Sequence, residues 1–484
     1  MKRLEIYGVV LAVLLLIIPA AVAAVPTTVT VFLHNDGVGL EPGITSSYYI
    51  DVFDGTSTTI LGRFHNEDTF ILNAPRAVTY VAYTGSIRGP RSGLVTIGDG
   101  VNQLAVEYAS VEVYLHHGST VLDGSAGQYL LIADPIGQKF NGEVFEVPAG
   151  TQVPYQACTN SMCGSLLAGS FGSGPQWLAY EYTEVTVQLH NNGDPLNRPT
   201  YYLYVYDVDE RGTGEVFYAP EGAVASFDAV TTTAIGSVWG PTETATIGPP
   251  DQTLTYEYAT VQVHLYNGPD DLSWPYTLEV EDIGTFENGQ EFHVPPRTFV
   301  DYRAKVNTLI GPSQTASFVA GDQPLDVEYA TVKVKLINGM TQLYDRTTYF
   351  LEIEGLFVYT GYNDKFEVPA DTDFRYRAWT STPGIGTISG PWQTTRFGAG
   401  ARELVYEYAT VKFVFDLAGV NCPLQTRVTG IGNIANGGKV HVPWDTTVNV
   451  QADVCGGLSG IQQKTFSKGE GTVTWSMKGD YTQP

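Results

Sequence analysis

Two aspartates, Asp207 and Asp209, are the best candidates in this sequence for binding a cation. They lie in the run Asp207-Val-Asp-Glu210, and residues two apart on a β-strand share one face of the sheet. Carboxylate oxygens on one face are the ligands that Ca²⁺ prefers. No EF-hand-like ligand series surrounds them, and charged strand ends are commonly only solvated. The sequence therefore predicts no cofactor, and calcium is the one alternative.

Two tryptophans are candidates for binding a carbohydrate. Trp239-Gly-Pro241 and Gly390-Pro-Trp392 each place an indole beside a turn, where an aromatic face can stack on a sugar ring. The alternative is that each indole covers the open end of a small hydrophobic core. Both residues are predicted ligand-binding positions.

The four cysteines fall into two pairs by position, Cys158 with Cys163 and Cys422 with Cys455. Four cysteines allow three connectivities. Local pairing is favoured because the two pairs are far apart in the chain, and disulfides suit an exported protein. Free buried thiols are one alternative. Half of a metal site at Cys158 and Cys163 is another, but no second Cys or His pair lies near it in the sequence.

The sequence predicts no catalytic residues and no enzyme. His293 and His441 stand where other repeats have Glu146 and Glu367, so they are expected on the outward face of a strand. The closest match to a serine-nucleophile motif, within residues 169–174, has no helical pattern behind it, which such an elbow requires.

These candidate residues lie in different copies of an internal sequence repeat. A Glu-Tyr pair closes an apolar/polar alternation at residues 107, 181, 257, 328 and 407, so the pairs are 71 to 79 residues apart. A repeat of this length determines the architecture. The predicted ranges are a signal peptide at 1–24 and six modules, numbered one to six, at 25–108, 109–182, 183–258, 259–329, 330–408 and 409–484.

Each module shows the same signals. Its first strand has apolar residues at every second position, as in Val332, Val334 and Leu336, and Asn-Gly or a related turn usually follows. A later strand ends at proline, an aromatic-x-Ala strand comes next, and four modules have Gly-Pro before the last strand. Short strands and frequent turns predict an all-β fold of six tandem small antiparallel β-sandwich (Ig-like) modules of about 75 residues.

The Val-Pro-Ala-Gly-Thr turn at 147–151 and the tyrosine-rich closing strand resemble the tandem short Ig-like or PEGA-like repeats of bacterial and archaeal cell-surface proteins. The resemblance covers the mature chain in pattern and implies a surface location, but it specifies no activity. A β-grasp-like surface repeat would give many of the same signals.

The N-terminus and the charge point to export. Lys2-Arg3, the apolar run Val9 to Ile18 and small residues up to Ala24 form a signal-peptide pattern, with a retained membrane anchor as the alternative. The mature chain is expected to have no membrane span. The formal net charge of −25 argues against nucleic acid as a partner. Expected partners are other copies of the chain or cell-surface components, and polysaccharide under the alternative function.

The junctions carry one further signal. Leu325, Val327 and Tyr329 are odd-numbered, whereas Val332 and Leu336 are even. The apolar face therefore switches sides, which predicts a short stiff boundary between two cores instead of the middle of one strand.

Taken together, the sequence predicts a non-enzymatic structural or adhesive repeat protein, secreted or associated with the cell surface. Its form would be a rod-like spacer, with self-assembly into a filament or surface layer as a variant. A secreted carbohydrate-binding repeat array is the alternative.

Overall fold

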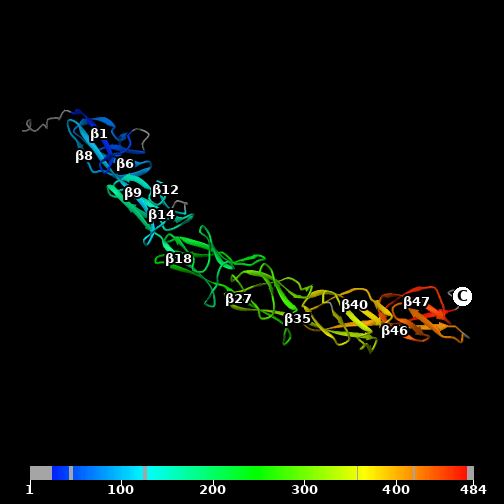
Figure 1. Cartoon of the computed structure of the whole chain (residues 1–484). Helices are drawn as coiled ribbons and strands as arrows, with labels where there is room; N and C mark the ends of the chain where they lie inside the picture. Colours follow the sequence, from blue (N-terminus) through cyan, green and yellow to red (C-terminus); the bar gives the residue numbers. More distant parts are fainter. Residues whose placement is uncertain (1–23, 43–46, 124–127, 357, 418–419, 477–484) are drawn as a thin grey trace, which may run out of the picture. The chain divides into compact units, whose positions relative to one another are not determined.

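A computed structural model describes residues 24–42, 47–123, 128–356, 358–417 and 420–476. The predicted signal peptide lies outside these ranges except for Ala24. Throughout the described residues the regular structure is β-strand, and Figure 1 draws no helix among them. The predicted all-β class is therefore confirmed.

The strands of modules one to three are short and numerous. In chain order they are β1 (Val25–Asn35), β2 (Val38–Gly39), β3 (Tyr48–Asp54), β4 (Ile60–Phe64), β5 (Thr69–Ala74), β6 (Arg76–Thr84), β7 (Ile87–Arg91), β8 (Val95–Ile97), β9 (Asn102–His117), β10 (Thr120–Val121), β11 (Tyr129–Ala133), β12 (Gly137–Lys139), β13 (Val144–Pro148), β14 (Gln152–Thr159), β15 (Met162–Cys163), β16 (Leu167–Ser170), β17 (Gly174–Glu181), β18 (Thr183–Asn191), β19 (Asp194–Pro195), β20 (Tyr201–Val205), β21 (Asp209–Arg211), β22 (Val216–Ala219), β23 (Val224–Thr232), β24 (Ser237–Trp239), β25 (Glu243–Thr246) and β26 (Gln252–Glu257).

The same succession continues through modules four to six. The strands are β27 (Ala259–Asn267), β28 (Asp270–Asp271), β29 (Tyr276–Val280), β30 (Gly284–Phe286), β31 (Glu291–Val294), β32 (Phe299–Val306), β33 (Leu309–Ile310), β34 (Gln314–Ser317), β35 (Gly321–Asn338), β36 (Thr341–Gln342), β37 (Tyr349–Ile353), β38 (Val358–Thr360), β39 (Lys365–Pro369), β40 (Thr372–Thr382), β41 (Gly386–Ser389), β42 (Gln393–Phe397), β43 (Gly400–Asp416), β44 (Leu424–Val428), β45 (Gly432–Ala435), β46 (Lys439–Pro443), β47 (Thr446–Val454), β48 (Gly457–Leu458), β49 (Gln462–Phe466) and β50 (Glu470–Ser476).

Two sheets pack together in modules one, two, four, five and six, and module five shows the pattern. One sheet is antiparallel, with the order β38-β37-β40-β41 and β42 also paired to β40. In the other sheet β35 pairs with β39 antiparallel and with β43 parallel. Apolar residues of both sheets meet in one core, because Val334 of β35 and Leu351 of β37 belong to the same buried cluster. The structure thus forms the predicted sandwiches, with one parallel strand pair that the sequence signals did not reveal.

The same parallel pair occurs in five modules. In each of them the closing strand runs beside the first strand of the same module. It is seen at β1 with β9, β9 with β17, β27 with β35, β35 with β43, and β43 with β50. A parallel pair needs a crossover connection, and here the remaining strands of the module provide it.

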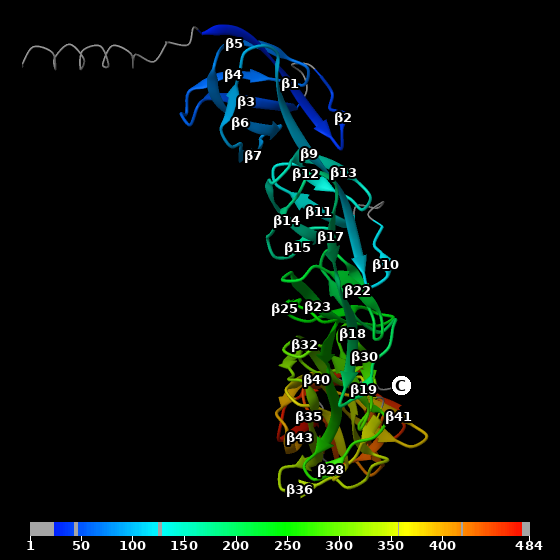
Figure 2. The ribbon, with the colours of Figure 1, turned by 90° about the vertical axis from the view of Figure 1, so that its left-hand side faces the viewer.

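At three junctions one strand serves two modules. β9, β35 and β43 each run without interruption through the Glu-Tyr pair, and β9 can be followed as a single ribbon in Figure 2. At the other two junctions the strand is interrupted at Tyr182 and at Tyr258. The predicted switch of the buried face is confirmed, since Tyr329 and Ala330 are adjacent and both fully buried. The prediction that the junction is not the middle of a strand is wrong at three places.

The chain divides into two compact units. The first comprises residues 1–188, 204–227 and 243–254, and the second comprises 189–203, 228–242 and 255–484. In the second unit a sheet with the order β28-β27-β35-β43-β46 passes through modules four, five and six. The boundaries of the six predicted modules remain predictions.

Candidate functional site

The most regular feature of the molecule is the joint between one module and the next. Each of the five joints contains the tyrosine of the Glu-Tyr pair, whose side chain is at most 1% exposed. Its hydroxyl lies within hydrogen-bonding distance of one or two backbone carbonyl oxygens on the two middle strands of its own module. The contacts are Tyr108 with Tyr83, Tyr182 with Leu130 and Cys158, Tyr258 with Tyr202 and Val230, Tyr329 with Thr277 and Lys305, and Tyr408 with Phe350 and Trp379.

The buried tyrosine ring also meets a second tyrosine edge to face. The ring centroids of Tyr329 and Tyr276 are 5.4 Å apart, with an interplanar angle of 80°. The same arrangement occurs at the other four joints, at Tyr48–Tyr108, Tyr129–Tyr182, Tyr201–Tyr258 and Tyr349–Tyr408. Edge-to-face pairs contribute about 0.5–1.5 kcal/mol beyond the area they bury. Burial raises the pKa of Tyr329, so it remains a neutral donor.

A glycine and a proline from neighbouring modules meet at every joint. A Cβ atom placed on Gly311 would lie 2.9 Å from Cβ of Pro369 and 3.2 Å from the carbonyl oxygen of Ala304. That carbonyl accepts a hydrogen bond from the Gly311 amide at 2.8 Å. Any side chain at this glycine would therefore push the two modules apart. The other four pairs, at 2.6–2.8 Å, are Gly89 with Pro148, Gly164 with Pro220, Gly240 with Pro295 and Gly390 with Pro443.

Three joints also bury an apolar residue of one module in the core of the next. Ile87 belongs to the core cluster of module two, Val238 to the cluster that contains module four, and Ile388 to that of module six. Each stands two positions before the glycine of its joint. The modules therefore share hydrophobic cores and do not merely touch.

One position in the joint varies between modules. The residue two before the proline is Glu146, Tyr218, His293, Glu367 or His441, and each faces the second tyrosine of the preceding module. The Tyr276 hydroxyl, for example, donates to Glu367 at 2.7 Å. His293 and His441 are half-buried here. The expectation that they are outward surface residues is wrong, because the neighbouring module covers that side of the strand.

The predicted calcium residues do not lie on one strand face. β20 ends at Val205, and Asp207 stands in the turn that follows. Asp207 and Asp209 have φ angles of 66° and 108°, so the alternation of an extended strand does not apply to them. The Asp209 carboxylate accepts the Glu210 amide at 2.9 Å. Within the described ranges, His, Cys, Asp and Glu side chains do not gather in groups of three or more that would hold a metal ion. Calcium binding stays an untested prediction.

The two predicted sugar-binding tryptophans have different surroundings. Trp239 is 47% exposed and lines a groove of about 220 Å³ together with Glu281, Asp282 and Asp301. Trp392 is half-buried, and the guanidinium carbons of Arg375 and Arg377 lie 5.1 and 4.5 Å from its ring centroid. A sugar would have to compete with those cations for the ring of Trp392. Trp239 is the more exposed of the two.

The cysteines pair locally, Cys158 with Cys163 and Cys422 with Cys455, as expected from their positions. The first disulfide closes the β14–β15 hairpin. The second joins residues just outside the ends of β44 and β47. Each disulfide therefore links strands of its own module.

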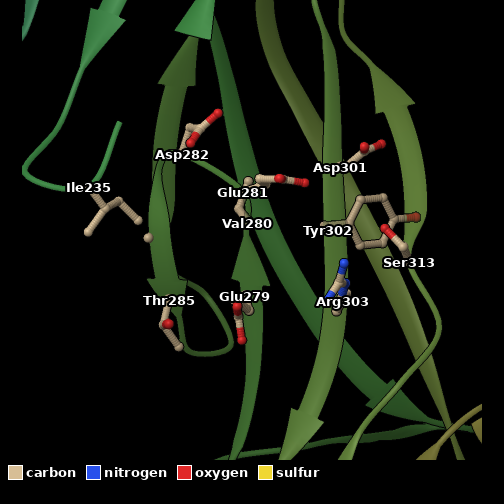
Figure 3. Close-up of a pocket in the computed structure, with 11 residues that line it drawn as sticks. Ile235, Glu279, Val280, Glu281, Asp282, Thr285, Asp301, Tyr302, Arg303 and Ser313 are labelled. Atoms are coloured by element: carbon tan, nitrogen blue, oxygen red, sulfur yellow. The ribbon is translucent and has the colours of Figure 1, made fainter. Parts of the chain in front are cut away.

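A second groove adjoins the one at Trp239 and has a volume of about 280 Å³. Figure 3 shows its acidic residues, with Glu281, Asp282 and Asp301 around the upper part and Glu279 beside Arg303 below. The carboxylates of Glu281, Asp282 and Asp301 belong to exposed residues. The groove therefore presents negative charge to solvent.

Sequence signals marked the proline and the tyrosine of each joint separately, and the glycine at four of the five joints. They did not show that the glycine of one module meets the proline of the next. The constant order of these residues in successive modules was the signal that could have suggested it. The described part of the chain holds no helix of the length and apolarity needed to span a membrane.

Comparisons with known proteins give little support for a family. No protein-family model and no curated protein matches the chain. Among solved structures, the Bacillus anthracis TIE protein is similar at 10% identity and a TM-score of 0.15, covering 68% of this chain and 72% of its own.

Two adhesins are also among the similar structures. The pilus adhesin SpaC of Lactobacillus rhamnosus GG has 9% identity and a TM-score of 0.15, and covers 74% of this chain and 53% of its own. A Ca²⁺-stabilized adhesin with which an Antarctic bacterium binds ice has 10% identity and a TM-score of 0.09. The match covers 78% of this chain and 99% of the adhesin chain. These scores are too low to carry an argument, so the likeness to Ig-like or PEGA-like repeats stays a prediction.

Proposed function

We propose that this chain is a non-enzymatic structural spacer of the cell surface, which holds a neighbouring element or partner at a fixed distance. The observation that carries the proposal is the strand shared between modules. β35 pairs with β27 from Gly321 to Glu328 and with β43 from Ala330 to Ile337. Because one hydrogen-bonded strand belongs to both sheets, there is no flexible linker at which the two modules could bend.

The disulfides and the charge support a location outside the cell. Disulfides persist in oxidising compartments. A net charge of −25 favours solubility and weakens association with anionic surfaces. Partners would be cell-surface components that bind along the modules or at the ends.

End-to-end polymerisation through the same joint is not part of this proposal. In module six the position of the joint glycine is taken by Ser459, whose amide bonds to Ala452 as the Gly311 amide bonds to Ala304. Gly457 stands where the other joints have an apolar residue. A further module of this kind would therefore meet the Cβ of Ser459 where the joint requires a glycine.

Small-angle scattering of the secreted chain tests the spacer. Six modules of about 35 Å in line would measure about 200 Å, with a radius of gyration of about 58 Å. A compact globule of this length would have a radius of gyration of about 23 Å. A value near the globular one would refute the spacer.

An insertion tests the role of the shared strand. A Gly-Ser pair placed between Tyr329 and Ala330 should reduce the radius of gyration and broaden the distance distribution, because it breaks β35 at the joint. The same pair inserted beside Met340, a fully exposed turn residue, is the matched control and should change neither quantity. An equal effect of both insertions would show that the joint does not set the stiffness.

A secreted carbohydrate-binding array is a second candidate, favoured by the exposed ring of Trp239 beside its polar groove. Retention on insoluble polysaccharides should then fall about fivefold on Trp239→Ala, since stacking on an aromatic face contributes of the order of 1 kcal/mol. Trp274→Ala removes another exposed indole, so it is the control and should leave retention unchanged. Absence of binding by the unmodified chain to any polysaccharide tried would remove this candidate.

A further inference from the structure

Two of the five joints contain a histidine at the position where two others have glutamate. These are His293, between modules three and four, and His441, between modules five and six. The joint between modules four and five has Glu367 instead. The chain thus has joints with a histidine at this position and a similarly built joint with a glutamate, which can serve as a reference.

The hydrogen bonds around His293 specify a neutral ring. The Asn191 amide nitrogen lies 3.3 Å from His293 Nδ1 and 3.4 Å from the carbonyl oxygen of Tyr258, and it also contacts the Thr260 hydroxyl. Because a carbonyl oxygen only accepts, it fixes this end of Asn191 as the donor. Nδ1 of His293 therefore faces a donor, which favours the neutral ring with its proton on Nε2.

The surroundings of His293 would stabilise a positively charged imidazolium ring only weakly. Asn191 is only 7% exposed, and the ring meets Tyr201 edge to face at 5.7 Å. Burial lowers the pKa of His293, and the carboxylates of Glu291 and Asp322 oppose this only in part. Asp322 is itself bonded to Asn192 at 2.6 Å.

His441 is half-buried as well, but its hydrogen-bond partner is a hydroxyl, which can accept as well as donate. Its Nδ1 lies 3.1 Å from the hydroxyl of Thr410, and its ring meets Tyr349 at 6.0 Å. Burial lowers the pKa of His441, Lys439 lowers it further, and Glu470 opposes both. Lys439 and Glu470 form an ion pair at 3.0 Å, so much of their charge is mutually compensated.

We propose that the joints at His293 and His441 are pH-sensitive couplings, which loosen when these rings take up a proton. A second ring proton would point the N–H of His293 Nδ1 at the N–H of Asn191 and would leave a charge half-buried between two modules. Opening the joint gives the imidazolium access to water. The function would be a spacer that is stiff at neutral pH and flexible in acid.

The direction of the pH effect follows from the lowered pKa. An opened joint releases the histidine to a pKa near the ordinary value of about 6.5. The closed joint is therefore fully favoured above that value and loses stability as the pH falls below it. The loss is complete once the pH is below the lowered pKa, because both states then bind the proton. Each unit by which closure lowers the pKa of the histidine reduces the equilibrium constant for closing the joint about tenfold at low pH.

Hydrogen exchange of the full chain tests the proposal. Peptides that cover Tyr258 to Gln262 and Glu291 to Val294 should lose protection several-fold between about pH 7.5 and about pH 5, after correction for intrinsic exchange. Peptides at the Glu367 joint serve as the internal reference. His293→Gln keeps an acceptor that does not titrate, so it should abolish the loss at this joint and leave the loss at His441 intact.

Two results would overturn the proposal. One is an unchanged pH response in the double variant His293→Gln/His441→Gln. The other is an NMR titration of the folded chain in which both rings have a pKa at or above about 6.5. Circular dichroism at neutral pH checks that each variant is folded. The outcome is independent of the spacer proposal, because a globular scattering profile would refute the spacer without changing these titrations.

Discussion

Replacing Tyr329 by alanine is expected to lower the free energy of unfolding of modules four and five by about 3–5 kcal/mol, the range for a large aromatic residue removed from a core. The ring is fully buried and packs edge to face on Tyr276. Its removal would leave a cavity at the point where β35 passes from one module to the next. Urea unfolding followed by circular dichroism measures the loss.

The variant Tyr329→Phe separates the hydroxyl from the ring. The hydroxyl lies 3.0 Å from the carbonyl oxygen of Thr277 and 3.1 Å from that of Lys305, and it accepts the Lys305 amide at 3.2 Å. Phenylalanine would leave these backbone groups without this partner, at a cost of about 1–3 kcal/mol. Tyr359→Ala is the control, because Tyr359 is 67% exposed, and it should change stability by less than about 1 kcal/mol. If Tyr329→Phe were as stable as the unmodified chain, the hydroxyl would have no part in holding the joint.

The architecture was predictable because it depends on local patterns. Val332, Val334 and Leu336 alternate with polar residues and are all fully buried. The change of parity between Val327 and Val332 correctly places the buried residues of the two halves of β35 on opposite faces of the strand. A hydrophobic period of two needs no knowledge of distant contacts, so the sequence contains this information directly.

The joints were not predictable because their contacts are between residues far apart in the chain. Gly311 and Pro369 are 58 positions apart (369 − 311), and each has a sufficient local explanation as a turn residue or a strand end. His293 was placed on a water-facing strand surface for a related reason. Alternation shows which side of a strand faces away from its own core, but not whether another module covers that side.

The assumption that the two candidate calcium ligands share one strand face was wrong for a local reason. It required the second strand of module three to continue through Asp207 and Asp209, whereas β20 ends at Val205. Asp and Asn tolerate positive φ in turns, so acidic residues after a strand are equally good signals for a turn. The sequence alone is compatible with both a strand and a turn at these aspartates, and it does not show which of the two forms.

Replacing Gly311 by valine is expected to open the joint between modules four and five, at a cost of about 1–3 kcal/mol for overpacking. The new Cβ would stand 2.9 Å from Cβ of Pro369, 3.2 Å from the carbonyl oxygen of Ala304 and 3.3 Å from the Thr372 hydroxyl. A proline ring and a strand carbonyl cannot rotate away, so the modules must separate. Hydrogen exchange along β33 and β39, together with urea unfolding, measures the change.

A double-mutant cycle shows whether the contact with Pro369 is the cause. Gly311→Ala should destabilise the joint less than valine does, and Pro369→Gly removes the atom that the new methyl group meets. The destabilisation by Gly311→Ala should therefore be smaller in the Pro369→Gly background, by about 0.5–3 kcal/mol of coupling. Gly460→Ala is the control, because a Cβ there meets no atom within 4 Å, and it should be neutral. Additive effects of the two substitutions would mean that the glycine is required by its own turn and not by the neighbouring module.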